Sequence, residues 1–302
     1  MILGKEILEG FERHLTLEGV SKETKVQYVK IAGYFLEWLK SKNITPDVLR
    51  EWKAYLSERK SPFTVNLYLS VARIFLKFLN ENGALDVTVK SVKGVKKPKK
   101  HMKDILSDDE ILLLFNTVRT DDLKGKRDLA ILKLAAYTGL RLVSIQEMNV
   151  GDVYRKGGKW VMRYRGKGHV AKDKEIALHL DVIRALNSYL EERKKYSPFK
   201  PEDPMFISLS KNSFGKRITS RALRMIFNEY YRKAGIKGFN RKITAHSVRH
   251  TVITKVAVEK GVEFARQIAD HANITTTMIY YHEAMDASLK ADEVISYEEN
   301  KE

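Results

Sequence analysis

The chain has 302 residues, of which 43% are apolar, so it can form one large or two ordinary domains with packed cores. Its 55 lysines and arginines exceed its 38 acids and give a formal charge of +17, which predicts attraction to a polyanion, most simply nucleic acid. The absence of cysteine excludes disulfides and cysteine-based metal sites and favours a cytoplasmic protein. No run of about 18 apolar residues and no charged-then-apolar leader occurs, so no membrane association is expected.

Residues 1–90 predict a small bundle of about four helices. Ser21 and Ser61 each begin a segment as a capping residue, and Pro62 occupies the first helical position of the second segment. Apolar residues at helical spacing follow both caps, and packing in the core is the favoured role of their aromatic members, with a base-stacking surface as the alternative. The helices are expected at about 4–18, 21–42, 46–59 and 61–82.

A lysine-rich run follows the predicted bundle. Residues 90–103 read KSVKGVKKPKKHMK, with seven lysines and no acid. Such a run repels itself and cannot be buried, so residues 91–104 are predicted to be an extended linker. The linker lysines are candidate ligands of DNA phosphates, with a solvated tether as the alternative: Lys96, Lys97, Lys99 and Lys100.

Residues 105–302 predict a second domain that is mostly helical with a small antiparallel β-sheet. A capping box at Ser107 and Glu110 begins it, and Gly139 ends a helix that contains Leu129 and Ala135. Two short strands are expected at 159–164 and 173–178, joined through Gly-Lys-Gly. Further helices are expected at about 181–195, 219–234, 246–260 and 275–283. The fold class is therefore mainly α.

Several residues of the second domain suit phosphate chemistry. His246 and Arg249 are three apart on a predicted helix, so both can reach one phosphate. Arg141, beside the turn at Gly139, is placed to complete a clamp with Arg249. Two arginine forks stabilise the charge that builds on the non-bridging oxygens of a phosphodiester under attack.

Three further residues complete a candidate catalytic set. Lys167, at the tip of the predicted hairpin, can protonate a departing 5′ oxygen. His271 can hold a phosphate oxygen or orient a nucleophile. Tyr280 can attack phosphorus and form a 3′-phosphotyrosyl ester, which preserves the bond energy so that no ATP, metal or other cofactor is required. Each residue alone has an ordinary structural role as its alternative, and the joint order carries the interpretation.

The motifs TGLR at 138–141, AHSVRH at 245–250 and DHANITTTMIYYH at 270–282 resemble those of the tyrosine recombinase (phage integrase) family, in its compact Xer-like and simple integrase form. The resemblance implies a helical core-binding domain and a catalytic domain that clamp double-stranded DNA at a specific site. It also implies a homotetramer on paired sites. The family spacing of nine residues from His271 selects Tyr280 over Tyr281 as the nucleophile.

Two positions depart from the family pattern. Many members carry an acid three residues after the first catalytic arginine, where this chain has Ser144; Glu147, one turn further, is a candidate substitute. Members commonly have glycine before the second histidine, where this chain has Asp270. Neither change removes a phosphate-contacting group, so activity is expected to survive.

The resemblance therefore implies a site-specific recombinase, either for integration and excision of a mobile element or for Xer-type dimer resolution. A type IB-like topoisomerase is one alternative, since it shares the nucleophile and clamp but relaxes DNA without site choice. A catalytically silent DNA-binding regulator is another, and the intact residue set argues against it. Residues 284–302 are expected to dock as a short amphipathic tail on a neighbouring protomer, with folding back or fraying as the alternative.

Overall fold

The computed structural model divides the chain into two compact units, residues 1–98 and 99–302. Each unit is described by itself below. At positions 2, 3, 280 and 282–284 only the backbone is described. The described residues are 2–40, 42, 44–96, 104–166, 168–169, 171–238, 241–271 and 273–284.

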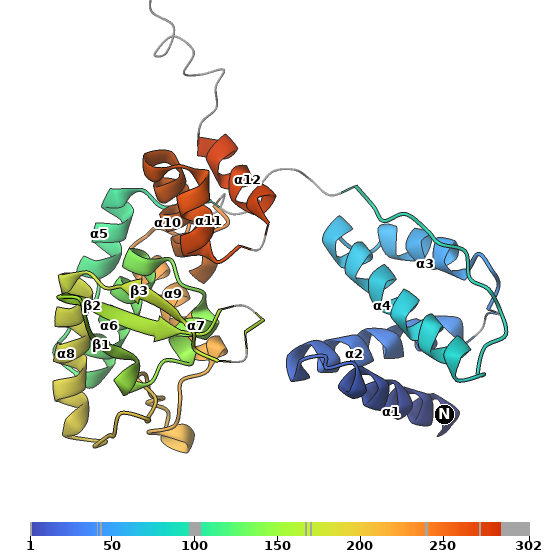
Figure 1. Cartoon of the computed structure of the whole chain (residues 1–302), viewed down its shortest axis with the longest axis horizontal. Coiled ribbons are helices and arrows are strands. Elements are labelled where there is room, and N and C mark those ends of the chain that lie inside the picture. The colour runs from blue at the N-terminus through green and yellow to red at the C-terminus, as the bar shows by residue number, and fades with distance from the viewer. Residues whose placement is uncertain are drawn as a thin grey trace, which may run out of the picture. The chain divides into compact units, whose positions relative to one another are not determined.

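The first unit is a helical bundle, as the sequence predicts (Figure 1). The side chain of Ser21 accepts a hydrogen bond from Thr24 N and that of Ser61 accepts one from Thr64 N, so both expected caps begin helices. Proline at the start of the last helix costs no hydrogen bond because the first helical N–H groups have no partner within the helix. The helices are α1 (Ile2–Leu17), α2 (Lys22–Leu39), α3 (Val48–Ser57) and α4 (Pro62–Glu81).

Aromatic rings fill the core of this bundle. Phe11, Phe35, Trp52 and Phe75 are fully buried, and their rings contact one another at centroid distances of 5.0 to 6.5 Å. These rings are core residues, as favoured from the sequence. Helix α4 is long and apolar enough to cross a membrane by length and composition, but it buries eight side chains in this bundle and forms part of its core.

A segment without regular secondary structure follows α4 and lies against the bundle. Valines at 89, 92 and 95 pack on the bundle core, although they alternate with exposed lysines. Asn66 fixes the end of the segment, because its side chain donates to Val95 O and accepts from Val95 N, both at 2.8 Å. Lys96 is exposed, whereas Lys97, Lys99 and Lys100 lie outside the described residues.

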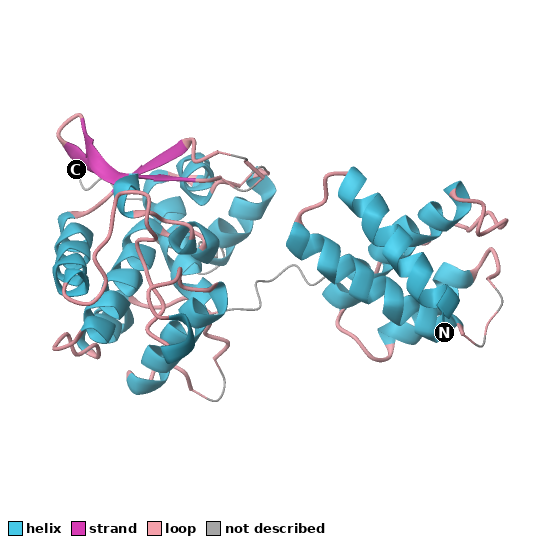
Figure 2. Ribbon diagram, turned by 90° about the horizontal axis from the view of Figure 1, so that it is seen from below, coloured by secondary structure: helices cyan, strands magenta, loops and turns pink. Residues whose placement is uncertain are grey.

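The second unit is mainly helical with a small sheet at one side (Figure 2). The sheet is antiparallel in the order β1-β2-β3, with Val153 opposite Met162 and Met162 opposite Ile176. Its strands are β1 (Val153–Lys156), β2 (Lys159–Tyr164) and β3 (Lys174–Ala177). The predicted fold class is confirmed, and β1 is the strand that the sequence analysis missed.

The capping box at Ser107 and Glu110 is present and begins the first helix of this unit. Helices α7 and α11 were not predicted; both are short. The helices are α5 (Asp108–Asn116), α6 (Leu123–Thr138), α7 (Leu142–Gln146), α8 (Leu180–Lys194), α9 (Ser220–Lys233), α10 (Ala245–Lys260), α11 (Val262–Ala269) and α12 (Ile274–Ala284), with 3₁₀ turns at Val150–Asp152 and Lys211–Ser213.

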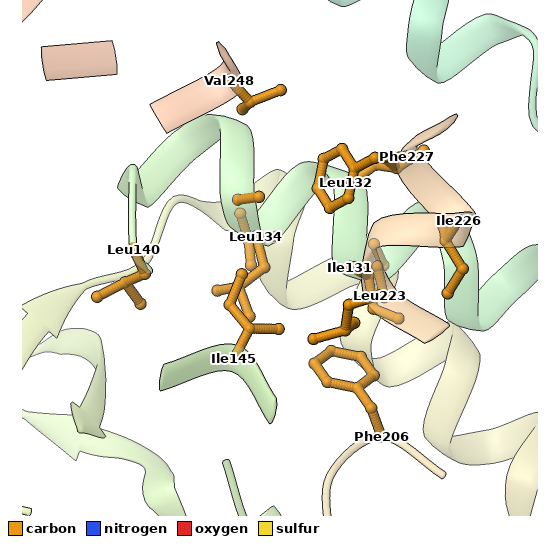
Figure 3. Close-up of a cluster of buried hydrophobic side chains, with 14 of the residues drawn as sticks. Ile131, Leu132, Leu134, Leu140, Ile145, Phe206, Leu223, Ile226, Phe227 and Val248 are labelled. Carbon is orange, nitrogen blue, oxygen red and sulfur yellow. The ribbon is translucent and has the colours of Figure 1, made fainter. Parts of the chain in front are cut away.

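Helix α6 lies at the centre of the second unit and packs against α8 and α10. Figure 3 shows Ile131, Leu132 and Leu134 of this helix among side chains from several other elements, including Phe206 and Phe227. All five side chains are fully buried. Because α6 is held from several sides, the turn that follows it at residues 138–141 is fixed in place.

Candidate active site

Arg141 projects from the turn that joins α6 to α7. Gly139 ends α6 in the left-handed conformation, with φ of 61°, and a Cβ atom there would lie 2.9 Å from Val252 Cγ1. Glycine is therefore required both by the backbone and by the close approach of α10. The turn presents Arg141 as the residue immediately before α7, where its side chain is mostly buried.

The guanidinium of Arg141 is held by the residue that ends α11. Arg141 Nη1 lies 3.1 Å from Asp270 Oδ2, and Arg141 Nη2 donates to Asp270 O at 2.8 Å. Lys174 of β3 also donates to the carboxylate, through Oδ1. One acidic residue thus joins the α6–α7 turn, the sheet and α11.

Arg249 is buried and connects three segments of the second unit. It donates to Gly139 O at 2.7 Å and to Ala269 O, and its Nη2 lies 3.4 Å from His271 Nε2. Arg141 and Arg249 therefore bind the carbonyl oxygens of consecutive residues at the C-terminal end of α11, where helix carbonyls attract cations. The two predicted clamp arginines lie beside each other and next to His271.

The pKa of His271 is determined by its position in the same cluster of residues. The pKa of His271 is lowered to about 4, first by burial and then by the positive charges of Arg249 and Arg141, against which the negative charge of Asp270 acts, with a smaller lowering by His246. His271 is consequently neutral at pH 7. His246 is exposed in the first turn of α10, with its ring 4.5 Å from that of His250.

A hydrogen bond links His271 to the helix that carries the predicted nucleophile. His271 Nδ1 lies 3.0 Å from Thr277 Oγ1, and the Thr277 side chain is fully buried in α12. Since Arg249 can only donate to Nε2, the neutral ring carries its proton on Nδ1 and donates it to Thr277. Position 280 follows one helical turn later on the same face of α12.

Replacing Thr277 with valine is therefore expected to slow DNA cleavage by roughly tenfold or less, since a net hydrogen bond contributes about 0.5–1.5 kcal/mol. Valine keeps the shape of the side chain and removes the hydroxyl that fixes α12 to His271. Single-turnover cleavage of a nicked DNA substrate measures the effect. Thr277→Ser, which keeps the hydroxyl, should remain near the wild-type rate, and equal rates for Val and Thr would contradict this linkage.

The two adjacent tyrosines differ in what the structure describes. Tyr281 is half-buried and packs on a small core formed by Ile253, Ala257, Ala265 and Ala269. Tyr280 lies in α12, with its backbone alone described. The packing of Tyr281 is typical of a structural residue, and the choice of Tyr280 as the nucleophile stays a prediction.

Lys167 lies outside the described residues, whereas the glycines before and after it are described. A Cβ atom at Gly166 would lie 3.2 Å from Asp270 Oδ2 and 3.0 Å from Lys174 Cε. Gly168 has φ of 83°, a conformation that favours glycine. Gly166, two residues after the end of β2, therefore lies directly beside the carboxylate that binds Arg141.

Two residues of this cluster were not predicted from the sequence, and the acid that contacts Arg141 was left undecided. Lys174 contacts Asp270, and Tyr164 is buried beside it: burial raises the pKa of Tyr164, as does the negative charge of Asp270. Glu147, the candidate substitute for the acid absent at Ser144, binds Arg165 through its carboxylate. The acid that contacts Arg141 is Asp270, which the sequence marked only as a departure.

Comparison with known proteins places this helical two-unit chain among DNA recombinases. The family model described as Phage integrase family matches residues 104–287, and the model described as Phage integrase, N-terminal SAM-like domain matches residues 8–83. The chain belongs to the phage integrase family and is a tyrosine recombinase, an enzyme of site-specific DNA recombination.

Three relatives illustrate the match. Tyrosine recombinase XerA of Pyrococcus furiosus is 28% identical over 92% of this chain and 90% of its own length. XerH site-specific recombinase, in a post-cleavage complex with a palindromic difH substrate, shares the fold with a TM-score of 0.72 and 19% identity, over 91% of this chain and 81% of that one. A lambda integrase tetramer bound to a Holliday junction has a TM-score of 0.67 and 17% identity, over 99% of this chain and 79% of that one.

Proposed function

We propose that the chain cleaves and rejoins double-stranded DNA at a specific site through a 3′-phosphotyrosyl ester on Tyr280. The observation that carries this proposal is the convergence of Arg141 and Arg249 on adjacent carbonyls of the α11 end. His271 follows directly, and the helix containing Tyr280 is bonded to it through Thr277. The segments come from distant parts of the chain and supply a phosphate clamp next to a nucleophile-bearing helix.

In the proposed reaction, Tyr280 Oη loses its proton to solvent water as it attacks the scissile phosphorus, and the bond from phosphorus to the 5′ oxygen breaks. Arg141 and Arg249 donate to the non-bridging oxygens, whose negative charge is greatest in the transition state. Lys167 gives its proton to the departing 5′ oxygen, which leaves a free 5′ hydroxyl on the cleaved strand. That hydroxyl, or the 5′ hydroxyl of a second cleaved strand, can attack the ester and reverse the step, releasing Tyr280 with its proton restored. The ester preserves the energy of the phosphodiester, so neither ATP nor a divalent ion enters the balance.

The histidines take different parts in this proposal. His271 is neutral, with its Nδ1 proton committed to Thr277, which supports a role in orienting the clamp and α12. His246 is exposed at the N-terminal end of α10, where its side chain and the first N–H groups of the helix favour an anion. His246 is accordingly assigned to a phosphate oxygen.

The proposed partner is duplex DNA, bound by protomers that form a homotetramer on paired sites in the cytoplasm. The charge of +17 supports attraction to a polyanion. The lambda integrase structure, a tetramer on a Holliday junction, supports the assembly by analogy of fold. Lys96, at the end of the docked segment after α4, and the lysines at 97, 99 and 100 are proposed to contact backbone phosphates.

The function is tested with two supercoiled plasmids, one of which carries the DNA that flanks the gene. We expect cleavage, covalent adduct and strand exchange on that plasmid only, without added ATP or divalent ions. Relaxation of both plasmids to the same extent would favour a topoisomerase, and binding without any adduct would favour a silent regulator. The control for the adduct is the Tyr280→Phe protein.

The role proposed for Lys167 gives a separate prediction. Lys167→Ala should slow cleavage of normal DNA because the 5′ oxygen must leave as an alkoxide. A substrate with sulfur in place of the bridging 5′ oxygen needs no proton donor, so the mutant should regain most of the wild-type rate on it. Single-turnover rates on both substrates give the ratio, and a mutant that is equally slow on both would exclude acid catalysis by Lys167.

A further inference from the structure

Asp270 has a conformation that few side chains tolerate. Its φ of 51° is the one positive φ among non-glycine residues in the described ranges. Residues held in this left-handed region carry a conformational cost, which is smaller for Asp and Asn than for most side chains, whereas glycine adopts it freely. A helix end of this kind is the usual place for glycine. An acid at this position thus has a conformational cost, and the contacts of its carboxylate are the feature that can offset it.

The carboxylate is shared by two cations from different elements. Asp270 is 11% exposed in its side chain, against 23% for Arg141 and 32% for Lys174. The contact with Arg141 is two-pronged, because Nη1 binds the carboxylate and Nη2 binds the carbonyl of the same residue. A two-pronged contact fixes the plane of the guanidinium as well as its position.

No acid close to Arg141 in the sequence makes an equivalent contact with it. Position 144 in α7 is a buried serine, and Glu147 binds Arg165. Arg141 therefore receives its carboxylate from the end of α11, across 129 positions of sequence. The same carboxylate lies against Gly166.

We propose that Asp270 is a positioning residue, which orients the guanidinium of Arg141 toward the scissile phosphate. This inference rests on the clamp role proposed for Arg141. Two cations share one carboxylate, so the cluster keeps a positive charge for the phosphate. Arginine has five N–H groups, and the two that Asp270 binds leave three in a fixed plane. Orientation set before DNA arrives need not be established during the reaction.

The test compares Asp270→Asn with the wild type in two measurements: the dissociation constant for an intact DNA site, and the maximal cleavage rate of a nicked substrate at saturating protein. Asparagine tolerates the left-handed backbone and keeps the shape of the side chain, but it has no charge. We expect a cleavage rate lower by about 10- to 100-fold, the range for loss of a residue that orients a ligand. The dissociation constant should change little, since Arg141 makes one of many phosphate contacts.

Two further variants separate orientation from stability. Asp270→Gly relieves the backbone cost, so its melting temperature should equal or exceed that of Asp270→Asn while its cleavage is equally slow. Glu175→Gln is the matched control: Glu175 is the next residue of β3 after Lys174, and its carboxylate forms a surface pair with Lys156 at 2.6 Å. That variant should cleave at the wild-type rate.

The outcomes distinguish failure of this inference from failure of the proposed function. Wild-type cleavage by Asp270→Asn, with Arg141→Ala inactive, would overturn the positioning role and leave the clamp intact. Faster cleavage by Asp270→Asn and Asp270→Gly would also overturn it, because the carboxylate would then be masking Arg141. Wild-type cleavage by Arg141→Ala would remove the clamp role itself and this inference with it.

Discussion

Tyr280→Phe is expected to abolish the covalent protein–DNA adduct while DNA binding stays nearly intact. Phenylalanine keeps the aromatic ring, and the attacking oxygen is lost, so no phosphotyrosyl ester can form. A nicked substrate that releases a short 5′ fragment after cleavage traps the adduct. Denaturing electrophoresis then measures the adduct, and a gel shift measures binding.

Tyr281→Phe is the matched control in the adjacent position. Tyr281 packs against Ala265 and Ala269, and its ring accounts for that contact, so the variant should still form the adduct. Peptide mapping of the wild-type adduct identifies the modified tyrosine directly. An adduct on Tyr281, or one that persists in Tyr280→Phe, would show that the spacing from His271 selected the wrong residue.

Local signals in the sequence predicted most of the helices. Ser21, Ser61 and Ser107 are caps that the backbone N–H groups of the following turns require, and each begins a helix in the structure. Gly139 is identified in the same way, since a helix that ends sharply needs a residue that accepts positive φ. Such signals are contained within a few consecutive residues, so a single sequence is enough to read them.

The elements that the sequence did not predict are short and depend on tertiary contacts. Helix α7 has five residues, β1 has four and α11 has eight, too few for a clear apolar period. The docked segment after α4 is a related case. Its lysines predicted an extended, solvated run, but Val89, Val92 and Val95 recur among them and pack on the bundle. The prediction for this segment rested on the charge of its lysines. The spacing of its valines, which indicates packing on the bundle, was overlooked.

In the candidate site, too, local motifs could be predicted from the sequence, whereas contacts between distant segments could not. The residue types that suit phosphate chemistry could be read from the motifs, and the roles assigned to Arg141, Arg249 and Tyr280 stay predictions. The contacts that support these residues could not be predicted: Asp270 and Lys174 meet across 96 positions, and Arg141 and Asp270 meet across 129. Pairing between distant segments depends on the packed fold, which a single sequence does not display.

Arg249→Ala is expected to lower the cleavage rate by about 10²-fold or more, the range for loss of one donor to a developing oxyanion. Arg249 is buried and donates to the carbonyls of Gly139 and Ala269, so alanine also removes a brace between α10, the α6–α7 turn and α11. A slower mutant could therefore reflect lost structure as well as lost catalysis. Arg249→Lys keeps the charge without the planar fork and should be intermediate in rate.

A second buried arginine in the same unit separates the two effects. Arg193 is 2% exposed and donates to Pro204 O and Met205 O, so it braces two carbonyls as Arg249 does, but within α8 and the segment that follows it. Arg193→Ala should lower the melting temperature, yet its folded fraction should cleave at the wild-type rate. If Arg249→Ala loses no more activity per folded molecule than Arg193→Ala, Arg249 is a structural brace. A loss confined to Arg249→Ala, with the DNA site still bound, requires that its guanidinium act on the phosphate.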